Sequence, residues 1–400
     1  MLVAVTPSGP VRGRRVAVTG LGALTCVGEG VPALWSALAL PTAPASMRIG
    51  AFETAHLGGP KELRRLDPFA LYALAAADEA WRQSGLHGPL DDAGSIVTTG
   101  NGGLQTVLAQ DLVLSQKGPD RVSPFLVPMM MPNAATAAVS MRFGLGGPCE
   151  TVTTACAAGT HAIGNAARLV ASGRCPVAVA GGAEAVMVQI AEAGFRNMTA
   201  LSTLNLSRPF DLNRDGFVMG EGAGILILEE WDHALARGAT ILAEVLGAAS
   251  TADAFHITAP DPVARGAIRC MELALADAEI GASDVSHINA HGTSTQLNDL
   301  AESVAVRHVF GSDAPPVTSI KGHLGHSLGA AGALEGVVSV LTLQHQLIPP
   351  TAGTTDVDPA VGLDVVIGAP RPAKVDVVLS NSFGFGGHNG SVIFRRVEPS

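Results

Sequence analysis

Short, continuous runs of apolar residues recur along the whole chain and indicate strands. Runs of this length without polar alternation are typical of strands buried on both faces, as in a parallel or mixed sheet. We therefore expect strands within 14–20, 95–100, 176–182, 222–230, 239–249, 285–291, 315–320, 375–383 and 390–397.

Between these runs the apolar positions follow helical spacing, for example over 67–85 and 262–280. The long apolar stretch 328–346 contains Glu335, and we interpret it as a buried core helix rather than a membrane span. Strands that alternate with helices in this way predict a layered α/β fold.

No Pro/Ser-rich linker divides the chain, and the best internal boundary lies near residue 240. Both sides of it contain strands, helices and Gly-rich turns, although no internal sequence repeat is visible. We therefore expect one fold built from two halves, 1–240 and 241–400.

Composition narrows the classes of protein that remain. Aromatic residues are only 4% of the 400, whereas Gly occurs 47 times, so the elements must pack closely through small side chains. A net charge of −10 and few aromatics argue against nucleic-acid binding. The five cysteines lack CxxC spacing, and the N-terminal MLVAV is too short for a signal peptide. Both observations favour a reducing cytoplasm over a set of disulfides.

Cys156 stands in TTACAAG (153–159), where a strand and a sharp turn lead into a helix expected over 157–172. The positive end of a helix dipole favours the thiolate, which is the reactive form of cysteine. A buried cysteine that merely packs is an equally good interpretation of this position alone. For the other four cysteines packing is the better interpretation.

Three further segments place polar side chains beside glycines. His291 follows an apolar strand in NAHGTST (289–295), and Lys321 and His326 lie in SIKGHLGH (319–326). The i,i+3 pair His323 and His326 lacks further ligands at familiar spacing, so we expect no metal. The turn NSFGFGGHNG (381–390) allows close backbone approach to a ligand but lacks the residues of a phosphate loop.

One cysteine and two histidines in such surroundings suggest a specific chemistry. A thiolate accepts an acyl group from a thioester. Two imidazole N–H groups that converge on a carbonyl oxygen stabilise an enolate. An enolate beside an acyl-enzyme is the arrangement that carbon–carbon bond formation requires.

Taken together, these motifs resemble β-ketoacyl-acyl carrier protein synthases, in particular the synthase II branch and type II polyketide ketosynthases. The resemblance extends over nearly the whole chain. It implies a thiolase fold, five αβαβα layers from two similar halves, and decarboxylative Claisen condensation of an acyl group with malonyl-acyl carrier protein. The product, a 3-oxoacyl-acyl carrier protein, belongs to fatty acid or type II polyketide biosynthesis. The segments that carry the resemblance are 14–28, 123–128, 154–159, 181–186, 207–230, 253–258, 289–295, 325–335 and 381–394.

The resemblance also implies roles for individual residues. Cys156 is expected to accept the acyl group, and His291 and His326 to drive decarboxylation. Lys321 is expected to support the site, paired with Glu302. The backbone N–H groups of Cys156 and Phe385 are expected to form the oxyanion hole. The remaining implied positions are Phe385 (oxyanion hole and gate), Phe383 (beside the gate), Met129, Met130, Met131, Phe195, Thr293 and Thr295 (substrate tunnel), and Asn289, Glu335, Ser380 and Asn381 (a monovalent cation of some relatives).

The chain departs from the family pattern near the acyl site, at Ala157, Ala158 and His388 and in the Met-rich segment 127–138. These departures concern the acyl substrate rather than the chemistry. The implied partner is acyl carrier protein, in its acyl and malonyl forms, and the implied assembly is a homodimer or a heterodimer with a chain-length-factor-like subunit. No cofactor, nucleic acid or membrane is expected.

Two alternatives remain. A silent partner subunit is disfavoured by the presence of Cys156, and an acyltransferase that does not decarboxylate is disfavoured by the histidine pair.

Overall fold

A computed structural model describes residues 13–398, and its largest sheet contains eleven strands. The N-terminal MLVAV lies outside the described residues. Each of the predicted apolar runs overlaps a strand. The strands are β1 (Val16–Thr25), β2 (Gly28–Glu29), β3 (Gly94–Thr98), β4 (Cys149–Glu150), β5 (Val177–Glu184), β6 (Gly222–Glu230), β7 (Ala243–Ala252), β8 (His287–Asn289), β9 (Val317–Thr318), β10 (Leu347–Ile348), β11 (Arg371–Pro372), β12 (Val377–Gly384) and β13 (His388–Arg395).

Helices connect these strands, and the predicted helices are all present. The α-helices are α1 (Val31–Leu38), α2 (Pro60–Leu63), α3 (Pro68–Ser84), α4 (Leu104–Lys117), α5 (Leu126–Met130), α6 (Ala134–Phe143), α7 (Ala158–Ala171), α8 (Gln189–Asn197), α9 (Trp231–Ala236), α10 (Arg265–Asp277), α11 (Gln296–Phe310), α12 (Lys321–Leu324) and α13 (Ala331–His345). Short 3-10 helices are η1 (Pro119–Arg121), η2 (Ala155–Ala157), η3 (Ala282–Asp284), η4 (Gly311–Asp313) and η5 (Leu328–Ala330).

Local sequence explains where the helices begin and end. The Asp67 side chain caps α3 by accepting the N–H of Phe69, Pro68 occupies the first turn, and Gly85 ends the helix with a φ of 69°. The Thr295 hydroxyl caps α11 by accepting from the N–H of Asn298. The second cap involves Thr295, which also lines the cavity described below.

The two halves of the chain repeat one strand order, which the sequence does not reveal. From the middle outward, the first half runs β1-β6-β5-β3-β4 and the second runs β7-β13-β12-β8-β9. In the first half, β1–β6 and β6–β5 are antiparallel pairs and β5–β3 is a parallel pair. In the second half, β7–β13 and β13–β12 are likewise antiparallel and β12–β8 is parallel. The halves join where β1 pairs with β7. A common topology therefore underlies both.

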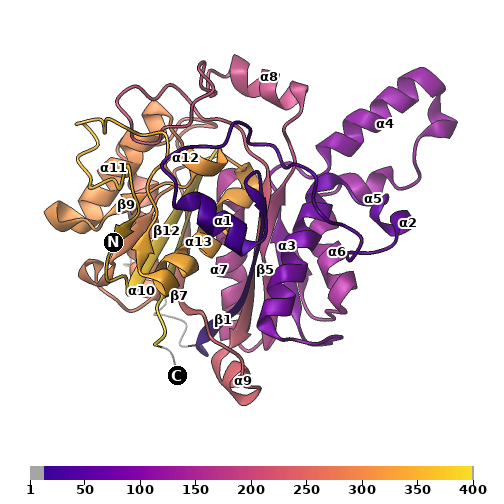
Figure 1. Ribbon diagram of the computed structural model, residues 1–400, viewed down its shortest axis with the longest axis horizontal. Coiled ribbons are helices and arrows are strands. Elements are labelled where there is room, and N and C mark those ends of the chain that lie inside the picture. The colour runs from indigo at the N-terminus through magenta and orange to yellow at the C-terminus, as the bar shows by residue number, and fades with distance from the viewer. Residues whose placement is uncertain (1–12, 399–400) are drawn as a thin grey trace, which may run out of the picture.

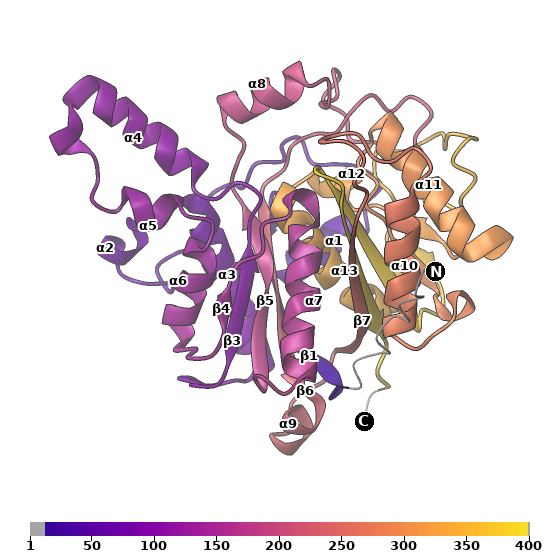
Figure 2. The same ribbon diagram turned by 180° about the vertical axis from the view of Figure 1, so that it is seen from behind.

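Five layers result from this arrangement (Figures 1 and 2). Helices α7 and α13 form the central layer, because they contact strands of both halves. Helices α3 and α6 cover the outer face of the first half, and α10 covers that of the second, with α11 beside it. The αβαβα layering implied by the resemblance is confirmed.

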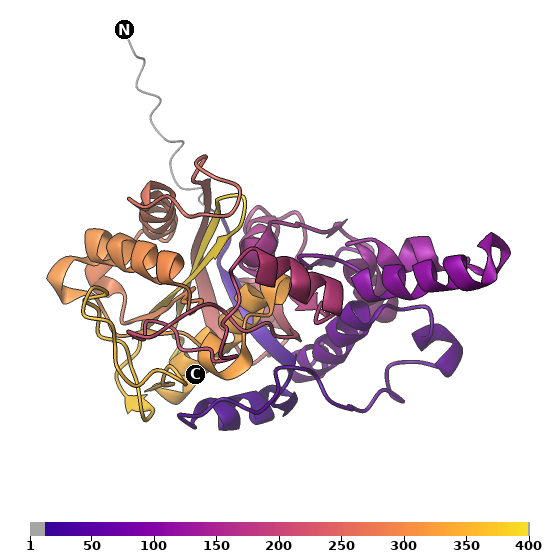
Figure 3. The same cartoon turned by 90° about the horizontal axis from the view of Figure 1, so that it is seen from above.

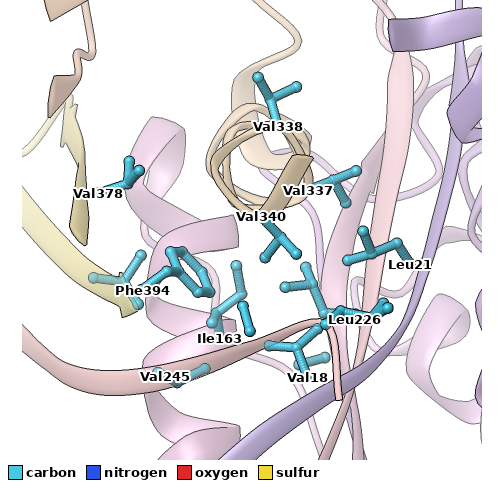
Figure 4. Packing of buried hydrophobic residues seen from close by; sticks show 14 of the residues in the cluster. Val18, Leu21, Ile163, Leu226, Val245, Val337, Val338, Val340, Val378 and Phe394 are labelled. Carbon is cyan, nitrogen blue, oxygen red and sulfur yellow. The ribbon is translucent and has the colours of Figure 1, made fainter. Parts of the chain in front are cut away.

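Small residues let the central helices approach closely. A Cβ on Gly159 of α7 would lie only 2.4 Å from the backbone nitrogen of Ala333 on α13. Apolar side chains from both halves fill the space around the pair; Figure 4 shows Val18, Leu21, Ile163, Leu226, Val245, Val337, Val338, Val340, Val378 and Phe394. The expectation of close packing through small side chains is thus confirmed.

Helix α4 projects from the body (Figure 3), and α5 leads from it back to α6. Met130 and Met131, at the end of α5, are exposed. No helix between residues 13 and 398 is both long and apolar enough to cross a lipid bilayer.

Candidate active site

Cys156 lies in the short 3-10 turn η2, immediately before α7 begins. The residue before it, Ala155, has a φ of 50°, a left-handed conformation that only surrounding contacts can maintain for a residue with a Cβ. The cysteine side chain is buried but reaches a cavity in the described chain. The expected position at a helix start is thus observed, two residues before α7 begins at Ala158.

The thiol of Cys156 is neutral at rest. Burial raises its pKa from an ordinary 9.0 to about 12. The positive charge of Lys321 and the backbone N–H groups of Phe385 and Cys156 act in the opposite direction but do not outweigh burial. The backbone N–H groups at this helix start favour the thiolate, as expected, but desolvation is the larger effect.

The glycine-rich turn between β12 and β13 packs directly on the turn that carries Cys156. A Cβ on Gly384 would lie 3.0 Å from the carbonyl oxygen of Thr154 and 3.1 Å from the nitrogen of Cys156. Gly386 and Gly387 follow with φ values of 81° and 73°, which favour glycine. The N–H of Phe385 is thereby brought to the thiol.

His291 and His326 form a pair that lines the same cavity. His291 follows strand β8, and His326 lies between α12 and α13. Their rings meet edge to face, with centroids 5.4 Å apart. Burial lowers the pKa of both imidazoles well below 6.5, and the charge of Lys321 contributes in the same direction. Both rings are neutral at pH 7, and each carries one N–H.

Lys321 determines which nitrogen of His291 carries the proton. The lysine Nζ lies 3.3 Å from Nδ1 of His291 and 2.6 Å from the His291 carbonyl oxygen, and it pairs with the carboxylate of Glu335. An ammonium group only donates, so Nδ1 of His291 accepts and the ring proton is on Nε2. Lys321 thus orients a hydrogen-bond donor without lining the cavity itself.

Glu302 is not the partner of Lys321, and that prediction is wrong. Its two carboxylate oxygens accept the backbone N–H groups of His291, at 2.8 Å, and Gly292, at 2.7 Å. Burial raises the pKa of Glu302 to about 7. The observed partner, Glu335, is the single acidic residue of the apolar helix α13, and a lone carboxylate in such a helix is the signal that the sequence offered.

A second buried carboxylate near the cysteine was missed. Glu184, at the end of β5, accepts the N–H groups of Gly100, at 2.7 Å, and Gly329, at 3.0 Å. Burial raises its pKa to about 7. Glu184 ties the loop after β3 to the turn after His326, and the sequence offered only the motif GGAEAV as a signal.

One cavity of about 360 Å³ brings most of the predicted residues together. Its lining includes Cys156, Phe195, His291, Thr293, Thr295, Glu302, His326, Phe383 and Phe385. Phe195 packs between Phe385, at 6.4 Å between ring centroids, and Phe217, at 5.3 Å. Met129, Met130 and Met131 lie at the end of α5 and do not line this cavity, so their tunnel role stays a prediction.

The four residues suggested for a cation provide only part of a site. The side-chain oxygens of Asn289 and Ser380 have no hydrogen-bond partner within residues 13–398. However, Lys321 occupies the Glu335 carboxylate, and the Asn381 oxygen accepts from Ser391. The full set of oxygen donors therefore does not fit a cation. Within the described chain there is also no cluster of three or more His, Cys, Asp or Glu side chains suited to a metal ion.

Two family models match this chain. Residues 45–234 match the family described as "Beta-ketoacyl synthase, N-terminal domain", and residues 242–355 match "Beta-ketoacyl synthase, C-terminal domain". The chain belongs to the β-ketoacyl synthase family. Its members are condensing acyltransferases, so the chain is an enzyme of this class, as the resemblance implied.

Individual relatives of this synthase agree over almost the full length. The 3-oxoacyl-[acyl-carrier-protein] synthase 2 of Synechocystis sp. is 42% identical, covering 96% of this chain and 99% of the relative, and that of Rhizobium meliloti has the same identity and coverage. Among solved structures, the ishigamide ketosynthase/chain length factor superposes with a TM-score of 0.90 at 34% identity, over 96% of this chain and all of that one. The family fold and the condensing activity thus have independent support.

Proposed function

We propose that this β-ketoacyl synthase holds an acyl group on Cys156 and condenses it with a malonyl group carried by acyl carrier protein. The observation that carries the proposal is one cavity whose lining includes a buried thiol and two neutral imidazoles. The products are CO2 and a 3-oxoacyl-acyl carrier protein extended by two carbons.

In the first step the sulfur of Cys156 attacks the thioester of an acyl-carrier protein. A new S–C bond forms, the old C–S bond breaks, and the thiol proton ends on the departing pantetheine sulfur. Because the resting thiol is neutral, the proton must leave as the attack proceeds. The N–H groups of Cys156 and Phe385 are placed to stabilise the negative oxygen of the intermediate.

In the second step the imidazoles donate to the thioester oxygen of the malonyl group. The bond to the carboxylate breaks, CO2 leaves, and its electron pair forms the enolate, so no strong base is needed. Neutral donors suit this task, since they stabilise the developing charge without taking up a proton. The enolate carbon then attacks the acyl carbon, and the Cys156 sulfur departs and recovers a proton from water.

Partner and setting form part of the proposal. One solved relative, with 30% identity and a TM-score of 0.86, comes from a complex of a type II polyketide synthase acyl-carrier protein with its ketosynthase. That complex supports a carrier-protein partner for this chain. We further infer a division into halves 1–240 and 241–400, a cytoplasmic location and a homodimer. A heterodimer with a chain-length-factor-like subunit is the alternative assembly.

The test uses intact-mass spectrometry on the purified chain. A panel of acyl-carrier proteins of increasing chain length is added, first alone and then with malonyl-carrier protein. We expect an acyl adduct on the wild type, none on Cys156→Ala, and 3-oxoacyl product from the wild type only. Absence of both adduct and product with every acyl length would overturn the proposal and favour a silent partner subunit.

A further inference from the structure

His161 of α7 is held at both ring nitrogens by groups from the two halves of the chain. Its Nδ1 lies 2.7 Å from the hydroxyl oxygen of Thr154, and its Nε2 lies 3.0 Å from the carbonyl oxygen of Asn389. Thr154 begins the turn that carries Cys156, whereas Asn389 follows the glycine-rich turn of Phe385. The imidazole therefore links the two segments whose N–H groups point at the thiol.

The hydrogen bonds define one tautomer of this ring. A carbonyl oxygen only accepts, so Nε2 carries the proton that is donated to Asn389. Burial lowers the pKa of His161 and keeps the ring neutral. Nδ1 is consequently bare and accepts the proton of the Thr154 hydroxyl. No other uncharged side chain of this size offers one donor and one acceptor in such fixed opposite directions.

The backbone that His161 holds is strained and tightly packed. Thr154 has φ −129° and ψ 47°, and the next residue, Ala155, has a φ of 50°. Such conformations persist only where neighbouring contacts hold them. On the other side, a Cβ on Gly390 would lie 3.1 Å from the His161 ring, so the ring sits directly against β13. The two turns are thereby kept at a fixed separation.

His161 does not reach the reacting groups. It is buried and does not line the cavity that contains Cys156 and the histidine pair. Any effect on the reaction must therefore pass through the backbone of the two turns.

We propose that His161 is a positioning residue that aligns the N–H groups of Cys156 and Phe385 as an oxyanion hole, by joining Thr154 to Asn389. The inference rests on the proposed function, in which that oxyanion hole serves transfer of the acyl group to Cys156. Decarboxylation of the malonyl group uses His291 and His326 instead. Loss of His161 should therefore separate the two half-reactions.

The experiment measures both half-reactions in the same variants of the full chain. Single-turnover acyl transfer from an acyl-carrier protein is followed by intact mass, and decarboxylation of malonyl-carrier protein by CO2 release. We expect His161→Ala to slow acyl transfer about 10- to 100-fold, with little change in the KM for the acyl-carrier protein, and to change decarboxylation less than about threefold.

Conservative variants keep the test decisive if His161→Ala does not fold. His161→Gln retains a donor for the Asn389 carbonyl but loses the acceptor for Thr154, and Thr154→Val removes the hydroxyl with little change in shape. We expect each to slow acyl transfer by an intermediate factor, and the double variant to be no slower than His161→Gln alone. The matched control is His287→Leu, which removes a buried imidazole of β8 that has no hydrogen-bond partner in the described residues.

The outcomes separate this inference from the proposed function. If the wild type forms no acyl adduct, the proposed function fails and this inference fails with it. If the wild type is acylated and the His161 variants slow both half-reactions equally, or neither, only the positioning role is overturned. Additive losses in the double variant would likewise contradict a single link through His161.

Discussion

The two halves of the molecule share one topology but contribute different chemistry at the same topological position. In the first half, the connection from β4 to α7 carries Cys156. In the second half, the connection from β9 to α13 carries Lys321 and His326. Because α7 and α13 pack side by side in the central layer, these two connections meet at one cavity. A repeated fold thus brings the proposed nucleophile and a proposed hydrogen-bond donor together from distant parts of the chain.

Burial shifts the pKa of the cysteine and the pKa values of the histidines in opposite directions, and both shifts favour the neutral form. It raises the pKa of Cys156 and lowers the pKa of His291 and His326, because in each case it disfavours the charged form. The reacting groups are therefore neutral at rest. The nearby charges, Lys321 and Glu335, form an ion pair behind the cavity.

The largest expected effect comes from removing the nucleophile of the first half. Cys156→Ala should lower condensation by at least about 10³-fold, because no acyl-enzyme forms. Decarboxylation of malonyl-carrier protein should continue, since the second half supplies its donors. Product analysis and CO2 release measure the two rates. Full condensing activity in this variant would contradict the division of labour between the halves.

Removing the ion pair of the second half should lower the stability of the fold. Lys321→Met leaves the carboxylate of Glu335 buried without its partner, and we expect a loss of about 3–5 kcal/mol in the free energy of unfolding. Urea titration monitored by circular dichroism measures this loss. The double variant Lys321→Met with Glu335→Gln should recover part of it. No recovery would mean that packing of the lysine stem, rather than charge, dominates.

Removing a donor of the second half should leave the first half active. His291→Ala is expected to slow decarboxylation by about 10²–10³-fold, the usual effect of losing one preorganised donor. The acyl adduct on Cys156 should still form, and intact mass detects it. A decarboxylation rate equal to that of the wild type would remove His291 from the proposed pair.

The contact between the halves can be tested at the central helices. Gly159→Ala places a Cβ against the backbone of α13, which no side-chain rotation can relieve, so we expect a loss of about 1–3 kcal/mol in unfolding free energy. The control, Gly194→Ala on α8, has no atom within 4 Å of the new Cβ and should gain about 0.5–1 kcal/mol. Equal effects of the two substitutions would refute close packing as the cause.

The smallest effect concerns the protonation of Cys156. With a pKa of about 12, its thiolate fraction should rise tenfold for each pH unit across pH 7–10. The rate of iodoacetamide labelling, measured by peptide mapping, should follow the same slope, with the exposed Cys149 as an internal reference. A rate that levels off below pH 9 would show that Lys321 and the N–H groups outweigh burial.

Much of the fold followed from local pattern. Continuous apolar runs predicted the strands, and helical spacing predicted α3, α7, α10 and α13, because both depend on nearby residues. The pairing of Lys321 was predicted incorrectly, since Glu302 and Glu335 are both buried acids and only packing selects between them. The tunnel role given to Met129, Met130 and Met131 stays a prediction, because these residues do not line the cavity found within residues 13–398.

By itself, the sequence determined nine strand segments, four helices and the family, and it selected the candidate cysteine and histidines, since these depend on residue type and short-range spacing. Only the tertiary structure decided that the two halves repeat one strand order, that Glu335 rather than Glu302 holds Lys321, and that the Cys156 thiol is neutral. Each of these depends on burial and on contacts between residues far apart in the chain. Desolvation and long-range pairing are properties of the packed molecule, and no local pattern encodes them.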